Sequence, residues 1–149
     1  MSSFPIWDVV AAVGAASGIP ALGWQIFTWR AAQPSIKVKT VNSFPIYGGH
    51  AGELHFTAKT INDGGAEATI VSWGFRFPDG SNIVAMQQLP WSEQLPATIG
   101  PKKSADFHME ADEIIATCKA RGVRVRELRS WVRLATDKEI LGNPIPYTD

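Results

Sequence analysis

The sequence predicts a mainly β protein, in which one apolar, transmembrane-like α-helix precedes a β-sandwich of seven to eight strands with one short helix. Three observations favour this class. No charged residue occurs between Val9 and Trp29. Beyond that run, apolar and polar residues alternate in short stretches, as in half-buried strands. The 13 glycines and 10 prolines recur through the second half at a spacing typical of strands joined by turns. We therefore expect a helix and linker over residues 1–33 and the sandwich over 34–149.

The charge composition excludes a global electrostatic function. The 149 residues include 14 Lys plus Arg and 14 Asp plus Glu, so the formal net charge is zero. Nothing draws the whole chain to nucleic acid or to an acidic substrate. Cys118 is the only cysteine, which excludes an internal disulfide and the cysteine-rich zinc patterns. A single thiol fits a reducing compartment.

The apolar segment has the length of a membrane span. As a helix, the 21 residues from Val9 to Trp29 would cover about 30 Å, the thickness of a bilayer's hydrocarbon core. No cation precedes the run, which argues against a cleavable signal peptide. We expect a single pass through the cell membrane, in contact with lipid. Aromatic and cationic side chains at the two ends are expected to anchor the helix at the interface: Trp7, Trp24, Trp29 and Arg30.

One face of this helix carries small and polar residues at spacings of three and four. The stripe includes a Gly-x-x-x-Gly pair, which lets a second helix approach closely. We expect the stripe to pack against another transmembrane helix, of a second copy or of a partner protein, through these residues: Ala11, Gly14, Ala15, Gly18, Ala21 and Gln25. The alternative is that small residues are common in apolar helices by composition alone.

The flanking cations predict an orientation. Arg30, Lys37 and Lys39 follow the apolar run, and no lysine or arginine precedes it. Positive residues are retained on the cytoplasmic side of a span, so the β domain is expected in the cytoplasm.

The body of the chain has the pattern of strands in succession. Strands are expected at 36–41, 53–60, 67–77, 82–87, 104–109, 123–135 and 139–141. In the third of these, Val71, Trp73, Phe75 and Phe77 are expected to face inward. The Pro-Asp-Gly-Ser sequence from Pro78 predicts a hairpin turn. A short helix is expected from Ala111, because acidic residues open the segment and cations with a glycine close it.

Three stretches carry a resemblance to known domains: residues 62–80, 95–110 and 124–139. An Asn-x-Gly type turn precedes one inward-facing strand, and a Gly-Pro-Lys-Lys-Ser turn precedes another. This succession resembles small bacterial immunoglobulin-like sandwich domains and covers about residues 35–142. Similar architectures, with an amino-terminal helix before the sandwich, occur in uncharacterised bacterial and phage proteins. The resemblance implies a fold and carries no functional residues across.

The residue pattern offers no catalytic or metal motif. The histidines lack metal-ligand spacing, and His55 and His108 are expected on the outward faces of their strands. A metal site built from these two with a nearby carboxylate is the alternative. Cys118 lies in the last turn of its helix, where the dipole disfavours a thiolate. We therefore expect no catalytic residue, no metal, no cofactor and no enzymatic activity.

A run of six cations with one acid, Glu127, is the strongest local charge feature. Its members are Lys119, Arg121, Arg124, Arg126, Arg129 and Arg133. Arg124 and Arg126 would point the same way on a strand. The cluster could contact anionic headgroups or an acidic protein. The alternative is a solvated face with ion pairs to Glu110, Asp112 and Glu113. Nucleic acid is a poor fit, because Trp131 is the only aromatic residue among the cations.

The loop from Met86 to Pro96 carries Trp91, which would anchor a partner if exposed or would fold back over an end of the sandwich. Together these features predict a non-enzymatic, single-span interaction module, serving as an accessory or scaffold subunit of a membrane complex. The alternative is a structural subunit of a larger particle, including a phage virion, with the helix buried among protein neighbours.

Overall fold

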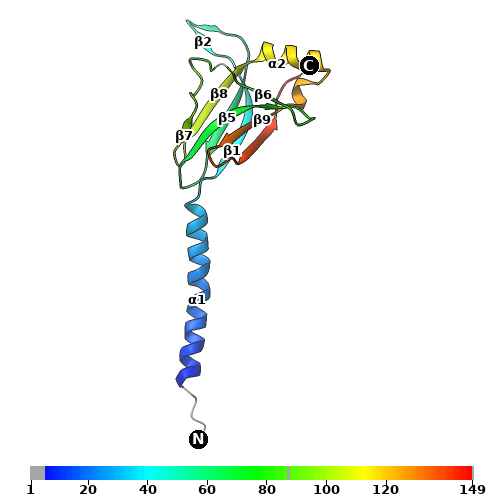
Figure 1. Cartoon of the computed structure of the whole chain (residues 1–149). Helices are drawn as coiled ribbons and strands as arrows, with labels where there is room; N and C mark the ends of the chain where they lie inside the picture. Colours follow the sequence, from blue (N-terminus) through cyan, green and yellow to red (C-terminus); the bar gives the residue numbers. More distant parts are fainter. Residues whose placement is uncertain (1–5, 87, 149) are drawn as a thin grey trace. The chain divides into compact units, whose positions relative to one another are not determined.

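The computed structural model describes residues 6–86 and 88–148, with side chains from residue 18 onward. The chain divides into two compact units, and the division falls between Gln33 and Pro34. The first unit contains helix α1 (Ile6–Ala31; blue in Figure 1), so the expected amino-terminal helix is present. Among the residues described, no helix is both long and apolar enough to cross a membrane.

The second unit is rich in β structure, as predicted. One antiparallel sheet has the strand order β1 (Ile36–Ser43), β4 (His55–Asn62) and β8 (Ser104–Glu110). A small hairpin follows β1 and consists of β2 (Ile46–Tyr47) and β3 (His50–Ala51). Figure 1 shows this hairpin at one end of the unit.

A second antiparallel sheet has the order β10 (Glu139–Pro144), β9 (Arg129–Leu134), β5 (Ala68–Arg76) and β6 (Asn82–Val84). Strand β7 (Ala97–Ile99) also pairs with β5. The expected hairpin turn joins β5 to β6: Gly80 has φ 87°, and the Asp79 carboxylate accepts a bond from the Ser81 N–H. The sequence does not predict the three short strands β2, β3 and β7, because two or three residues show no periodicity.

The two sheets share one hydrophobic core. Phe56 of β4 meets Phe75 of β5 with ring centroids 6.4 Å apart, and Trp73 of β5 meets Phe107 of β8 at 5.6 Å. All four side chains are buried. Inward-facing residues of both sheets therefore build the core together.

A bulge in β5 changes which residues of that strand face inward, and the prediction for this strand is partly wrong. The register with β9 shifts between Ile70 and Ser72. Ile70 and Trp73 are buried, whereas Val71 is 41% exposed. An extra residue in a strand inverts the alternation beyond it, so the prediction for Val71 is wrong, whereas Trp73, Phe75 and Phe77 are buried as expected.

The region after the second helix also differs from the prediction. Helix α2 (Ala111–Arg121) ends as expected at Gly122, which has φ 66° and donates to the carbonyl of Cys118. A 3-10 turn, η1 (Val125–Glu127), then precedes β9. Arg124 caps this turn and Arg126 lies within it, so the two do not project from one face of a strand. The backbone N–H and the guanidinium of Arg124 both donate to the Glu127 carboxylate. These local bonds favour the turn over an extended segment.

Candidate functional site

An open pocket lies over the outer face of the β1–β4–β8 sheet. It has a volume of about 370 Å³ and is lined by Ser43, Phe44, Pro45, Ile46, Tyr47, Trp91 and His108. We call it the Trp91 pocket. The segment after β1 and the loop that carries Trp91 supply its rim, and β8 supplies His108. Segments distant in the sequence therefore meet here.

The edge of β8 positions the loop that carries Trp91. The N–H of His108 donates to Ser92 Oγ at 3.1 Å, and the N–H of Glu93 donates to the Asp106 carbonyl at 3.2 Å. Ser92 is buried. These bonds occupy backbone groups of an edge strand that would otherwise lack partners, and they hold Trp91 beside the sheet.

The rim of the pocket is aromatic and open to solvent. The Trp91 ring meets the Tyr47 ring edge-on, with centroids 5.6 Å apart. The side chains of Trp91, Tyr47 and Phe44 are 45%, 51% and 57% exposed. Exposed aromatic residues gathered around a pocket are typical of binding anchors.

The floor of the pocket is a short hydrogen-bond relay. Ser43 Oγ lies 2.6 Å from Thr57 Oγ1, which lies 2.7 Å from His108 Nδ1. The two hydrogen bonds can run in either direction, because each hydroxyl can donate or accept and the ring nitrogen can do either, depending on the tautomer. When the relay runs from Ser43 to His108, His108 Nε2 carries a proton and donates; in the reverse direction Ser43 donates and Nε2 accepts. The floor thus offers one donor and one acceptor, as an amide group of a ligand requires.

Burial favours the neutral form of the pocket histidine. Desolvation lowers the pKa of His108; the Asp106 carboxylate opposes the shift, and His55 adds to it. A neutral imidazole can act as donor or acceptor, whereas a cation can only donate. The relay therefore keeps both of its directions near neutral pH.

His55 is not the exposed residue that alternation predicts. It is 4% exposed, and its ring meets the Trp91 ring edge-on at 5.7 Å. Its Nδ1–H donates to the Glu53 carbonyl at 2.8 Å, and its Nε2 is buried without a hydrogen-bond partner. Trp91 therefore covers the sheet beneath it, as one of the two expectations has it, and also lines an open pocket.

The described residues contain no group of three or more metal-binding side chains. The hydroxyl that lies against His108 Nδ1, at 2.7 Å, belongs to the buried Thr57, whereas Ser43 Oγ is 3.4 Å from that nitrogen and closer to Thr57. Cys118 is buried.

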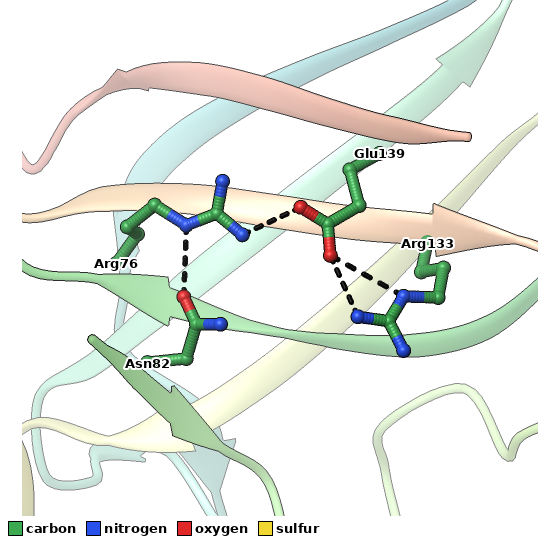
Figure 2. Close-up of polar contacts among 4 residues, drawn as sticks. All are labelled: Arg76, Asn82, Arg133 and Glu139. Carbon is green, nitrogen blue, oxygen red and sulfur yellow. Dashed lines mark hydrogen bonds and ion pairs between the residues drawn. The ribbon is translucent and has the colours of Figure 1, made fainter. Parts of the chain in front are cut away.

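The members of the cation run belong to α2, to η1 with its cap, and to β9. Glu139 accepts bonds from Arg76 at 2.6 Å and from Arg133 at 2.7 Å, and Arg76 Nε also donates to Asn82 at 2.8 Å (Figure 2). Arg121 donates to Ser81 Oγ and lies over the Phe77 ring. Among the described ion pairs, Glu127 pairs with Arg124 and Glu139 pairs with Arg133. None of these pairs involves the acids that the sequence suggested, Glu110, Asp112 and Glu113. The remaining members are Arg126 in η1, Arg129, bonded to the Gly142 carbonyl, and Lys119, in the last turn of α2.

Sequence reasoning missed a buried tryptophan outside the core. Trp131 pairs with Gly74 across the sheet, on the face opposite Trp73 and Phe75, yet it is 1% exposed. The guanidinium carbons of Arg76 and Arg133 lie 5.6 and 5.7 Å from its ring centroid. The Arg76–Glu139–Arg133 network thus covers Trp131. In the sequence, the pattern that could have predicted this is an aromatic residue at an outward-facing strand position between Arg129 and Arg133.

The described part of α1 presents apolar side chains to its surroundings. Six large apolar residues are each more than half exposed: Ile19, Leu22, Trp24, Ile26, Phe27 and Trp29. Of the expected stripe, Gly18, Ala21 and Gln25 are exposed, as is the expected anchor Arg30. A Cβ added at Gly18 would meet nothing within 4 Å. The side chains of Trp7, Ala11, Gly14 and Ala15 lie outside the described residues.

These features define a class: a β domain of two sheets with an aromatic pocket, preceded by a separate apolar helix. No known protein family matches the sequence, and no curated protein is significantly similar to it.

Proposed function

We propose that this chain is a non-enzymatic interaction module, an accessory or scaffold subunit that its amino-terminal helix anchors to a membrane. The β domain is an immunoglobulin-like sandwich that binds a partner protein through the Trp91 pocket. The observation that carries the proposal is the row of six exposed apolar side chains on α1, because such a surface must be covered by lipid or protein.

Two features support anchoring in lipid over simple burial, and a third concerns the orientation. The whole run from Val9 to Trp29 has no charge. Trp24 and Trp29 are exposed near its end, followed by Arg30, in the order that interfacial anchors take. The cations that follow the helix favour a cytoplasmic β domain.

Two features support recognition of protein at the Trp91 pocket. The rim carries three exposed aromatic side chains, the residue type that dominates binding energy at protein interfaces. The floor offers one donor and one acceptor, which match the carbonyl and N–H of a peptide group. The loose contact between Ser43 and His108 supports binding over nucleophilic catalysis.

A specific observation favours a second candidate, a structural subunit whose helix is buried among protein neighbours in a larger particle. No described helix qualifies as a membrane span, and the open positions at Gly18 and Gly23 suit close packing of another helix.

Alkaline carbonate washing of membranes separates the two candidates. The full chain should stay in the membrane pellet, and an Ile19→Asp, Leu22→Asp variant should be released, because each buried Asp costs about 2.5–3.5 kcal/mol near a helix centre. Met86→Asp is the matched control, since this apolar residue is 96% exposed in the β domain. Recovery of the unmodified chain in the soluble fraction would refute the anchor and favour the structural subunit.

Two further measurements test orientation and recognition. Protease added to intact cells should leave the β domain uncut, and cleavage from outside contradicts the cytoplasmic placement. A protein that co-purifies with the full chain in mild detergent should be lost with Trp91→Ala and retained with Met86→Ala. Equal recovery with both variants would exclude the pocket as the recognition site.

A further inference from the structure

A carboxylate of β8 lies beside the Trp91 pocket without lining it. Burial alternates along β8, so Glu110 shares the outer face of the sheet with the pocket residue His108. Glu110 is also the direct neighbour of His55 across the β4–β8 pair, and His55 lies against the Trp91 ring. The Glu110 side chain is exposed and caps no N–H of α2. It is therefore available to a ligand that occupies the pocket.

Two connecting segments bring further carboxylates to the same end of the sheet. Glu53 precedes β4, and its carbonyl accepts the bond from His55 Nδ1. Glu93 belongs to the loop that forms part of the pocket rim, and its N–H donates to the Asp106 carbonyl on β8. Both residues are exposed. Within the described chain, neither their carboxylates nor that of Glu110 form an ion pair. Three negative charges thus border the pocket without a cationic partner.

The lysines of this sheet lie toward its other end. Lys37 and Lys39 belong to the first half of β1, whereas the pocket begins at Ser43, the last residue of that strand. Lys59 of β4 lies opposite Lys39 and points to the Asp106 carboxylate, 4.0 Å away. No lysine or arginine lines the pocket. The outer face is therefore polarised although the net charge of the chain is zero, and the pocket lies at its negative end.

The rings of the pocket are also suited to a cation. The Tyr47 and Trp91 rings meet at 71°, and each side chain is about half exposed. The face of an aromatic ring attracts ammonium and guanidinium groups, and arginine is the commoner partner because its planar group also stacks. The domain uses this contact elsewhere, since the Arg121 guanidinium lies 4.4 Å from the centroid of the Phe77 ring. Ring chemistry and the surrounding charge therefore favour the same kind of ligand.

We infer that the Trp91 pocket takes a basic partner, an extended, arginine-rich segment of another protein. A peptide group of the segment pairs with the relay at the floor. The arginine side chains next to it lie across the rings of Tyr47 and Trp91 and reach the bordering carboxylates, Glu53, Glu93 and Glu110. This inference rests on the proposed function, because it names the chemistry of the partner at the same pocket. Charge attraction adds selectivity and a faster encounter to the contacts of the rim.

The test uses the full chain in an uncharged detergent at about pH 7.5, where an ordinary histidine is neutral. The probe is a labelled seven-residue peptide, acetylated and amidated, in which four arginines alternate with three alanines. Fluorescence anisotropy should show saturable binding that weakens at least threefold between about 50 mM and about 500 mM salt. A peptide with citrulline in place of arginine keeps the planar shape without the charge, and it should bind at least tenfold more weakly.

Protein variants localise the binding. The double variant Glu53→Gln, Glu110→Gln should weaken it at least threefold, because two carboxylates lose their charge with little change in shape. The matched control is Glu67→Gln, Asp137→Asn, which makes the same change of charge at exposed positions in the β4–β5 and β9–β10 connections. Trp91→Ala should weaken binding at least tenfold. Melting curves confirm that each variant is folded.

The outcomes separate this inference from the proposed function. Equal binding of the arginine and citrulline peptides, lost in both cases with Trp91→Ala, overturns the basic partner and leaves the pocket as a peptide site. No binding of the arginine peptide, or binding that Trp91→Ala leaves unchanged, also overturns the inference. Loss of a co-purifying protein with Trp91→Ala would in that case still support the proposed function. A dimer of the full chain that Trp91→Ala disrupts assigns the pocket to a second copy and overturns the inference as well.

Discussion

The Trp91 indole lies edge-on to the His55 imidazole, with 77° between the ring planes. This contact joins the loop after β6 to the start of β4, and it closes the outer face of the three-stranded sheet at that end. His55 is buried on a face that alternation assigns to solvent because Trp91 covers it.

Truncating Trp91 should expose this face. Trp91→Ala removes a half-buried ring, which we expect to lower the free energy of unfolding by about 1–2 kcal/mol. Diethyl pyrocarbonate should then modify His55 faster, as followed by site-resolved mass spectrometry. Phe44→Ala is the control, because Phe44 lines the same pocket and forms no ring contact with His55. An unchanged modification rate would show that Trp91 does not shield His55.

Gly74 is required by the close approach of β6. A Cβ at this position would lie 1.9 Å from the backbone oxygen of Ile83. Gly74→Ala should therefore destabilise the β domain by about 1–3 kcal/mol, the usual range for overpacking, as measured by urea unfolding. At Gly100 the nearest atom to an added Cβ is Lys103 Cδ at 3.5 Å, so Gly100→Ala is the matched control. Equal stability of the two variants would contradict the close contact between β5 and β6.

The lowered pKa of His108 predicts a pH dependence of stability. The unfolded chain takes up this proton near pH 6.5, whereas the folded chain does so at lower pH because burial disfavours the cation. The unfolded state therefore binds more protons in that window, and stability falls as the pH decreases from about 6.5 toward the folded pKa. Above the window the contribution is fully present.

Thermal unfolding between pH 5 and pH 8 measures this effect. His108→Gln should flatten the slope below pH 6.5, and His50→Gln, at an exposed position in β3, should leave the slope as it is. An identical slope in His108→Gln and the unmodified chain would mean that another group titrates there.

The Glu139 carboxylate holds two guanidinium groups over Trp131. Hydrogen bonds from Arg76 and Arg133 lower the pKa of Glu139. Glu139→Gln leaves two cations together without their anion. We expect the free energy of unfolding to fall by about 1 kcal/mol, and by less in about 1 M salt, which screens the repulsion. Glu127→Gln is the control, because it affects an exposed pair with Arg124. A salt-independent loss would indicate that packing over Trp131, and not charge, sustains the network.

Periodicity predicts the elements whose stability is local. Helix α2 is predictable because dipole-compatible charges and a left-handed glycine define its ends within the segment itself. The β5–β6 hairpin is predictable because Asp79 and Gly80 satisfy the turn without distant partners. Long strands such as β4 and β8 lie within about two residues of their expected bounds for the same reason.

Periodicity fails where a distant segment changes the environment of a residue. Val71 is turned outward by a bulge that depends on pairing with β9. Alternation places Arg124 and Arg126 on a strand, because it cannot distinguish a strand from the turn that holds them. The partners of the arginines in the cation run, Ser81, Glu127, Glu139 and Gly142, come from several segments, and alternation does not predict them either.

The amino-acid order alone predicts a break at about residue 33, a helix with a long uncharged run before it and alternating strands after it, because these depend on patterns within a few residues. The relay from Ser43 to His108, the cover over His55 and the contact between β1 and β10 arise from contacts between residues far apart in the chain. Such contacts depend on which strands pair and which loops pack on them, and local periodicity does not predict either.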